Sequence, residues 1–94
     1  MQAEKIGLIN QVVAQNSTAD AAFQTSLEMA KQMLQMGPKA LRMAKLAIDQ
    51  GTQVTLNTGL SIEKAAYAQL IPTRDRLEGL NAFVKKRKPK YTGS

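Results

Sequence analysis

The chain has 94 residues, enough for one small domain with a thin core, because a chain of this size buries only about 60–65% of its unfolded surface. A hydrophobic content of 44% argues against disorder, while an aromatic content of 4% without tryptophan leaves the core to small and aliphatic side chains. The absence of cysteine and histidine excludes disulfides, thiol chemistry and the commonest zinc ligands and general bases, so we expect no metal site.

The formal net charge of +6 is concentrated near the end of the chain. Up to Glu78 there are eight Lys/Arg and seven Asp/Glu, whereas the residues beyond it add five bases and no acid: Lys85, Lys86, Arg87, Lys88 and Lys90. Such a cluster attracts phosphate, nucleic acid or anionic lipid, but it is equally compatible with a solvated helix end favoured by the helix dipole. No apolar run approaches the roughly 18–20 residues that span a bilayer, so we expect no membrane partner.

At the start of the chain, residues 5–13 are expected to form a short strand, because apolar residues there point to both faces. A single strand cannot pair with itself. The segment must therefore dock on helices, pair with another copy, or belong to a sheet outside this chain.

A first helix is expected after a polar break at residues 16–18, where Ser17 and Asp20 have the spacing of a capping box. Its apolar positions recur at helical spacing from Phe23 to Leu34, and Gly37-Pro38 supplies a glycine stop followed by a proline start.

A second helix should run from Pro38 to Gly51, with a basic stripe or solvated face at Lys39, Arg42 and Lys45. The third should begin near Thr52 or Val54 and end near Ile71. Its apolar residues surround most of the helix, so it needs several neighbours. Gly59 inside it costs roughly 1 kcal/mol relative to alanine, which indicates close approach of another element, such as another subunit.

A fourth helix should begin after Pro72, with Thr73 as its N-cap and Asp75 in its first turn. The seven carboxylates are interpreted as surface charges, caps and ion pairs such as Arg74 with Glu78 at i, i+4, and none is assigned a catalytic role.

Three segments carry a family resemblance. IPTRDRLEGLNAFVKKRKPKYTG (residues 71–93) resembles the ending T-x-D-x-x-E-G-x-x-A-F-x-E-K-R-x-P-x-Y of enoyl-CoA hydratases of the crotonase superfamily. GPKALRMAKLAIDQG resembles the family segment G-P-x-A-x-x-x-A-K-x-A-I, and KIGLINQVV resembles its strand I-G-L-V-N-x-V-V. The likeness is greatest to the methylglutaconyl-CoA hydratase subgroup, one member of which is known as an AU-rich RNA-binding hydratase. Lys85 departs from the pattern, which usually has glutamate there.

This resemblance implies a mostly α structure, the C-terminal helical domain of the crotonase (ClpP/crotonase-like) fold, with about four helices after one short strand. Residues 1–14 would be the remnant helix end and strand of an upstream βα core, and residues 15–94 a C-terminal helical oligomerisation domain. The chain would be the terminal third of a longer enzyme, and the family location would be the mitochondrial matrix, with no transit peptide in this chain.

The parent enzyme implied by the resemblance hydrates 2-enoyl-CoA thioesters in fatty-acid or branched-chain amino-acid breakdown. It uses two glutamates and an oxyanion hole that lie upstream of these residues. This chain alone is therefore expected to be inactive, with coenzyme A thioester as a substrate of the parent and no further cofactor. By the same resemblance, Tyr67 and Lys86 are the candidate CoA-binding residues, for adenine and phosphate respectively.

Two alternatives come from other functional classes. The tail KKRKPKY combines cations with an aromatic side chain, which allows weak RNA or polyanion binding. The second alternative is a purely structural self-association domain, which requires only that the third helix is apolar on several sides and that Gly59 allows close approach. Three observations distinguish these functions. CoA binding that depends on Tyr67 supports the CoA-site role, steeply salt-dependent RNA binding supports the RNA-binding module, and assembly without either ligand supports the structural domain.

Overall fold

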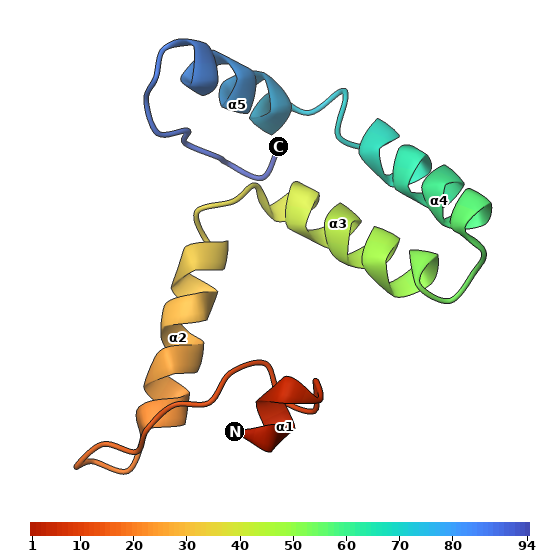
Figure 1. Ribbon diagram of the computed structural model, residues 1–94. Helices are drawn as coiled ribbons and strands as arrows, with labels where there is room; N and C mark the ends of the chain where they lie inside the picture. The colour runs from red at the N-terminus through yellow and green to blue at the C-terminus, as the bar shows by residue number, and fades with distance from the viewer. The chain divides into compact units, whose positions relative to one another are not determined.

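The computed structural model describes residues 1–94 and contains helices but no strand (Figure 1). The helices are α1 Gln2–Lys5, α2 Ala21–Met33, α3 Pro38–Gly51, α4 Leu56–Ala68 and α5 Arg74–Val84. The predicted mostly α class is confirmed. The chain forms two compact units, Met1–Gln32 and Met33–Ser94. The predicted boundary between residues 14 and 15 stays a prediction.

The prediction of a strand at residues 5–13 is wrong. Residues Gln2–Lys5 form α1, and Gly7 then turns the chain with a φ of +79°, a left-handed value that suits glycine. Beyond the turn, the Val12 N–H donates to the Glu4 carboxylate at 3.2 Å. Backbone groups that would have joined a sheet find local partners or solvent, because the chain offers no second strand to pair with.

The N-terminal end of α2 is organised by Asp20 instead of the expected Ser17 capping box. Thr18, Gln24 and Asn16 donate side-chain hydrogen bonds to the Asp20 carboxylate at 2.5, 3.1 and 2.9 Å. These bonds stabilise the charged form and lower the pKa of Asp20 to about 2. The Asp20 carbonyl also accepts the Gln24 N–H, which places Asp20 directly before the helix.

The second unit is built on α3 and α4, which pack side by side and form the only extensive helix–helix contact (Figure 1). Pro38 occupies the first turn of α3, as predicted, and Thr55 caps α4 by accepting the Thr58 N–H. A Cβ on Gly59 would lie 3.1 Å from the Gly51 carbonyl oxygen, so the close approach expected at Gly59 is confirmed. The approaching element is α3 of the same chain.

Helix α5 begins as the sequence predicts. Thr73 accepts the Arg76 N–H at 3.2 Å, and Asp75 lies in the first turn. Only four non-glycine residues are buried, namely Ala66, Thr73, Asp75 and Ala82. Most large apolar side chains, including Phe83 at 84% exposure, therefore remain accessible. None of the five helices has the length and apolarity needed to cross a bilayer.

Candidate functional site

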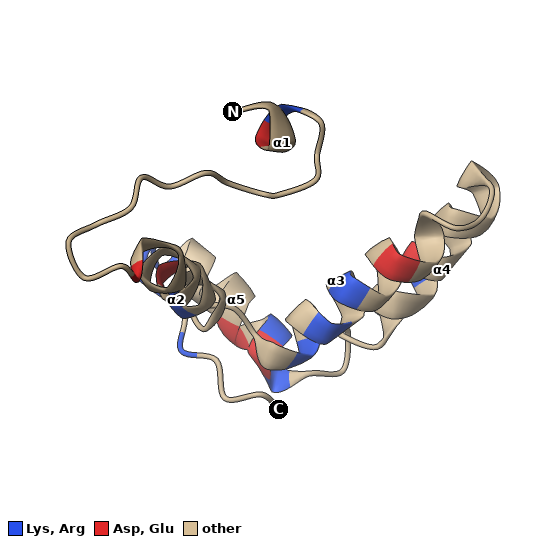
Figure 2. Cartoon of the chain, turned by 90° about the horizontal axis from the view of Figure 1, so that it is seen from below, with Lys and Arg blue, Asp and Glu red and all other residues tan.

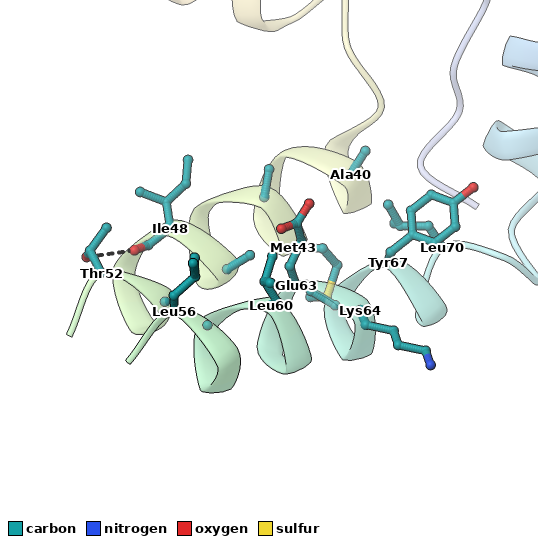
Figure 3. Close-up of a pocket in the computed structure, with 15 residues that line it drawn as sticks. Ala40, Met43, Ile48, Thr52, Leu56, Leu60, Glu63, Lys64, Tyr67 and Leu70 are labelled. Carbon is teal, nitrogen blue, oxygen red and sulfur yellow. Dashed lines mark hydrogen bonds between the residues drawn. The ribbon is translucent and has the colours of Figure 1, made fainter. Parts of the chain in front are cut away.

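An apolar groove of about 810 Å³ runs between α3 and α4 (Figure 3). Its walls are lined by Ala40, Met43, Ala44, Ala47, Ile48, Gly51, Thr52, Leu56, Gly59, Leu60, Glu63, Lys64, Ala66, Tyr67 and Leu70. Leu56 and Leu60 line it while remaining 77% and 53% exposed. The Gly51–Gly59 contact brings the two helices together at one end, so the groove is a consequence of the α3–α4 pairing.

Tyr67, the candidate adenine-binding residue, lies on α4 at the end of the groove opposite Thr52 and Leu56 (Figure 3). The residue is 55% exposed. An accessible ring face beside apolar walls is suited to stacking on a planar ligand. Lys86, the candidate phosphate-binding residue, is not among the groove-lining residues.

Lys86 is held by a separate arrangement in which the chain beyond α5 folds back onto that helix. Asp75 is the first anchor. Its carboxylate accepts the backbone N–H groups of Thr92 and Gly93, each at 2.8 Å, and its own N–H donates to the Ser94 carbonyl at 2.9 Å. The buried charge of Asp75 is thus met by tail backbone donors, as burial of a carboxylate requires.

Glu78 is the second anchor, and its partner differs from the predicted Arg74. Arg87 donates from both terminal nitrogens to the Glu78 carboxylate, at 2.6 and 3.2 Å, and the Lys90 N–H donates to the same group at 3.0 Å. The bonds from Arg87 and then Lys90 lower the pKa of Glu78 to about 2. Bidentate pairing favours this geometry over a single-point i, i+4 contact.

Tyr91 and Gly93 complete the return of the tail. A Cβ on Gly79 would lie 3.0 Å from the Tyr91 hydroxyl oxygen, so the absence of a side chain at Gly79 admits the tyrosine. A Cβ on Gly93 would lie 3.6 Å from the Pro38 ring, which brings the tail against the start of α3. We call the set Asp75, Glu78, Gly79, Arg87 and Tyr91 the α5–tail clasp.

The turn between α5 and the tail places Lys86 in an unusual backbone conformation. Its φ is +52°, in the left-handed region that glycine normally occupies just after a helix. The turn is closed by the bonds Lys86 N–H to Phe83 carbonyl at 3.2 Å and Arg87 N–H to Ala82 carbonyl at 3.0 Å. Lysine is therefore present where backbone energetics favour glycine, an arrangement often found at functional sites.

The cations of this region are mostly without acidic partners. Of the five tail cations, only Arg87 makes an ion pair. Acidic and basic residues both mark α5, and basic residues recur along α3, where Lys45 pairs with Asp49 at 3.1 Å (Figure 2). Lys85, Lys86 and Lys88 consequently present three free ammonium groups within one turn, a combination that attracts phosphate groups.

Asp75 and Glu78 are occupied by the tail, and no three acidic side chains gather as a metal ion would require. Sequence reasoning missed the clasp because its partners are 9 to 18 residues apart, beyond helical periodicity. The available signal was the D-x-x-E-G spacing, which puts two carboxylates and a glycine on one side of α5.

The chain is similar to known proteins over its whole length. The sequence profile of the family described as Enoyl-CoA hydratase/isomerase matches residues 1–94. The human protein "Methylglutaconyl-CoA hydratase, mitochondrial" is 55% identical over 92 residues, covering 98% of this chain and 27% of that protein. "Probable enoyl-CoA hydratase 2, mitochondrial" from Arabidopsis thaliana is 46% identical over 94 residues, covering all of this chain and 30% of that protein.

Solved structures agree with these relatives. The enoyl-CoA hydratase from Bacillus anthracis superposes with a TM-score of 0.88 at 44% identity, covering 99% of this chain and 34% of that one. An enoyl-CoA hydratase/isomerase from Mycobacterium paratuberculosis gives a TM-score of 0.89 at 29% identity, covering 99% and 35%. The chain thus spans roughly a third of these structures' length and 27% to 30% of the two curated relatives. The resemblance seen in the three sequence motifs is confirmed, and the chain belongs to the enoyl-CoA hydratase/isomerase family.

Proposed function

We propose that this chain supplies oligomer packing and part of the CoA site of an enzyme that hydrates 2-enoyl-CoA thioesters. The whole enzyme would act in fatty-acid or branched-chain amino-acid breakdown. Mitochondrial names among the relatives support the mitochondrial matrix as its location. The catalytic glutamates and oxyanion hole would come from residues outside this chain, which contributes binding and packing surfaces.

The observation that carries the CoA role is Lys86 in a left-handed turn. A free ammonium group in that position, flanked by Lys85 and Lys88, matches the phosphates of CoA in charge. A tail that is only solvated does not require lysine at a φ of +52°, because glycine adopts this φ at a lower conformational free energy. The strained lysine therefore supports a binding role.

Tyr67 supports the same role through a different interaction. Its accessible ring lies where the apolar groove ends, and a planar adenine gains from stacking on such a ring. By the family resemblance, Tyr67 and Lys86 would approach the adenine and phosphates of CoA that is bound mainly to a neighbouring subunit.

The groove supports the packing role. Several of its apolar side chains, including Ile48, Leu56 and Leu60, are more than half exposed, and exposed apolar surface rimmed by polar residues marks sites of association between protein chains. We assign a second copy of the chain as its occupant, because identical copies carry the complementary exposed helices.

RNA binding stays a prediction without a supporting observation of its own. The tail has the charge for it, but Arg87 is engaged by Glu78, which leaves fewer cations for a phosphate backbone.

Calorimetric titration with coenzyme A tests the proposal. Lys86→Ala should weaken binding roughly tenfold, the loss of one charge-assisted contact. Tyr67→Leu should weaken it at least about fivefold, from lost stacking. Lys31→Ala, which removes one cation from α2, is the matched control and should have little effect. Equal affinity of the wild type and Lys86→Ala would contradict the CoA role.

A further inference from the structure

We infer that Glu78 is a positioning residue for anion binding: through Arg87 and the Lys90 N–H it fixes the turn that holds the Lys86 ammonium group toward phosphate. The inference deepens the proposed CoA role of Lys86 and rests on it. It assigns to an acidic side chain a favourable effect on the binding of a negatively charged ligand.

The geometry of the turn supports this role. Glu78 contacts residues on both sides of Lys88, because Arg87 and Lys90 each donate to its carboxylate. The segment that follows Lys86 is therefore fixed at two points, and the residue before it, Lys85, is the helix cap. The Lys86 backbone is held in the left-handed region from both ends, so its side chain leaves the turn in a restricted direction.

Such restriction matters because a long side chain loses rotamer freedom when it binds. The conformational-entropy cost of binding is smaller if the backbone is already ordered in the bound conformation. Asp75 and Tyr91 extend the same restraint further along the tail, but they act on Thr92, Gly93 and Gly79, away from Lys86. Glu78 is the clasp residue whose tail contacts, at Arg87 and Lys90, lie nearest to Lys86 in the chain.

Simple electrostatics predicts the opposite effect of removing this carboxylate. Glu78→Gln deletes one negative charge from a region that also carries Lys85, Lys86 and Lys88, so through-space attraction alone would make anions bind more tightly. If Glu78 positions the turn, affinity should instead fall roughly two- to tenfold, the cost of ordering one long side chain on binding. The sign of the change separates the two accounts.

The test titrates the full chain with coenzyme A and, separately, with tripolyphosphate, and follows backbone amide exchange. In Glu78→Gln, the Arg87 and Lys90 amides should exchange faster while α3–α4 amides are unchanged. Glu28→Gln, an exposed change of equal charge on α2, should leave both affinities the same. Unchanged or tighter binding by Glu78→Gln would overturn the positioning role.

A charge-exchange variant tests whether a loss of affinity comes from the missing ion pair or from unfolding of α5. Glu78→Arg combined with Arg87→Glu restores an ion pair and should bind more tightly than Glu78→Arg alone, although the single variant is more positive. The reverse order of affinities would contradict the inference. If the wild type binds tripolyphosphate but not coenzyme A, the proposed CoA function is contradicted, and the effect of Glu78 on anion binding is still measured with tripolyphosphate. If the wild type binds neither ligand, both the CoA function and the positioning role of Glu78 are contradicted.

Discussion

Lys86 shows how a single residue departs from the conformation that its backbone prefers. A left-handed φ costs an L-residue roughly 1–2 kcal/mol, and the greater unfolded-state freedom of glycine offsets about 0.5–1 kcal/mol of that. We therefore expect Lys86→Gly to raise the free energy of unfolding by roughly 0.5–1 kcal/mol while weakening CoA binding. Urea denaturation and calorimetry measure the two effects.

Lys85→Gly is the control for this prediction. Lys85 has a φ of −83°, which any residue adopts, so glycine there should not stabilise the protein. A Lys86→Gly variant that is less stable than the wild type would contradict the left-handed turn.

At this same scale, the sequence predicted residues whose partners are local. Thr73 caps α5 and Pro38 opens α3, because a cap or a helix start depends on positions within one turn. The same local reasoning predicts Arg74 as the partner of Glu78, and this prediction is wrong. The tail brings Arg87 to Glu78 with two hydrogen bonds, a contact that periodicity does not contain.

Among the elements, the α3–α4 pair depends on the contact of Gly51 with Gly59. A Cβ at Gly59 already lies 3.1 Å from the Gly51 oxygen, so the further atoms of a leucine have no space. We expect Gly59→Leu to destabilise the protein by about 1–3 kcal/mol through overpacking. Thermal unfolding monitored by circular dichroism measures this loss.

Ala65→Leu provides the matched comparison on α4. Ala65 is exposed and does not line the groove, so leucine there should change stability by less than about 0.5 kcal/mol. Equal effects of the two substitutions would show that Gly59 is not a site of close packing.

The α5–tail clasp should depend on pH through Glu78. Hydrogen bonds from Arg87 and Lys90 lower the pKa of this carboxyl from its ordinary value of 4.5 to about 2. Because the folded-state pKa is depressed, the stabilisation is complete above pH 4.5 and is lost as the pH falls through about 2. The NMR chemical shift of the Lys90 amide should therefore change with pH, with a midpoint near pH 2. A midpoint near 4.5 would mean that the ion pair is absent in solution.

The elements also show what a sequence pattern cannot supply. Helices α2 to α5 follow from periodicity and punctuation, since an α-helix satisfies its hydrogen bonds internally. The segment at residues 5–13 has the composition of a strand, but a strand requires a partner, and this chain has none.

For the whole molecule, the carboxylates of Asp20, Asp75 and Glu78 are engaged by hydrogen bonds within the chain, and the family resemblance puts the catalytic glutamates upstream of these residues. We expect this chain alone to show no hydratase activity. The absorbance of the enoyl-CoA double bond should decay at the background rate. Faster decay that is sensitive to a point substitution in this chain would contradict that expectation.

The claim that the chain is a packing segment is tested most directly by analytical ultracentrifugation over a wide concentration range. We predict concentration-dependent association, its loss in Leu60→Glu, which places a charge in the groove, and its retention in Lys86→Ala. A wild-type chain that remains monomeric at high concentration, with Leu60→Glu sedimenting in the same way, would contradict the account.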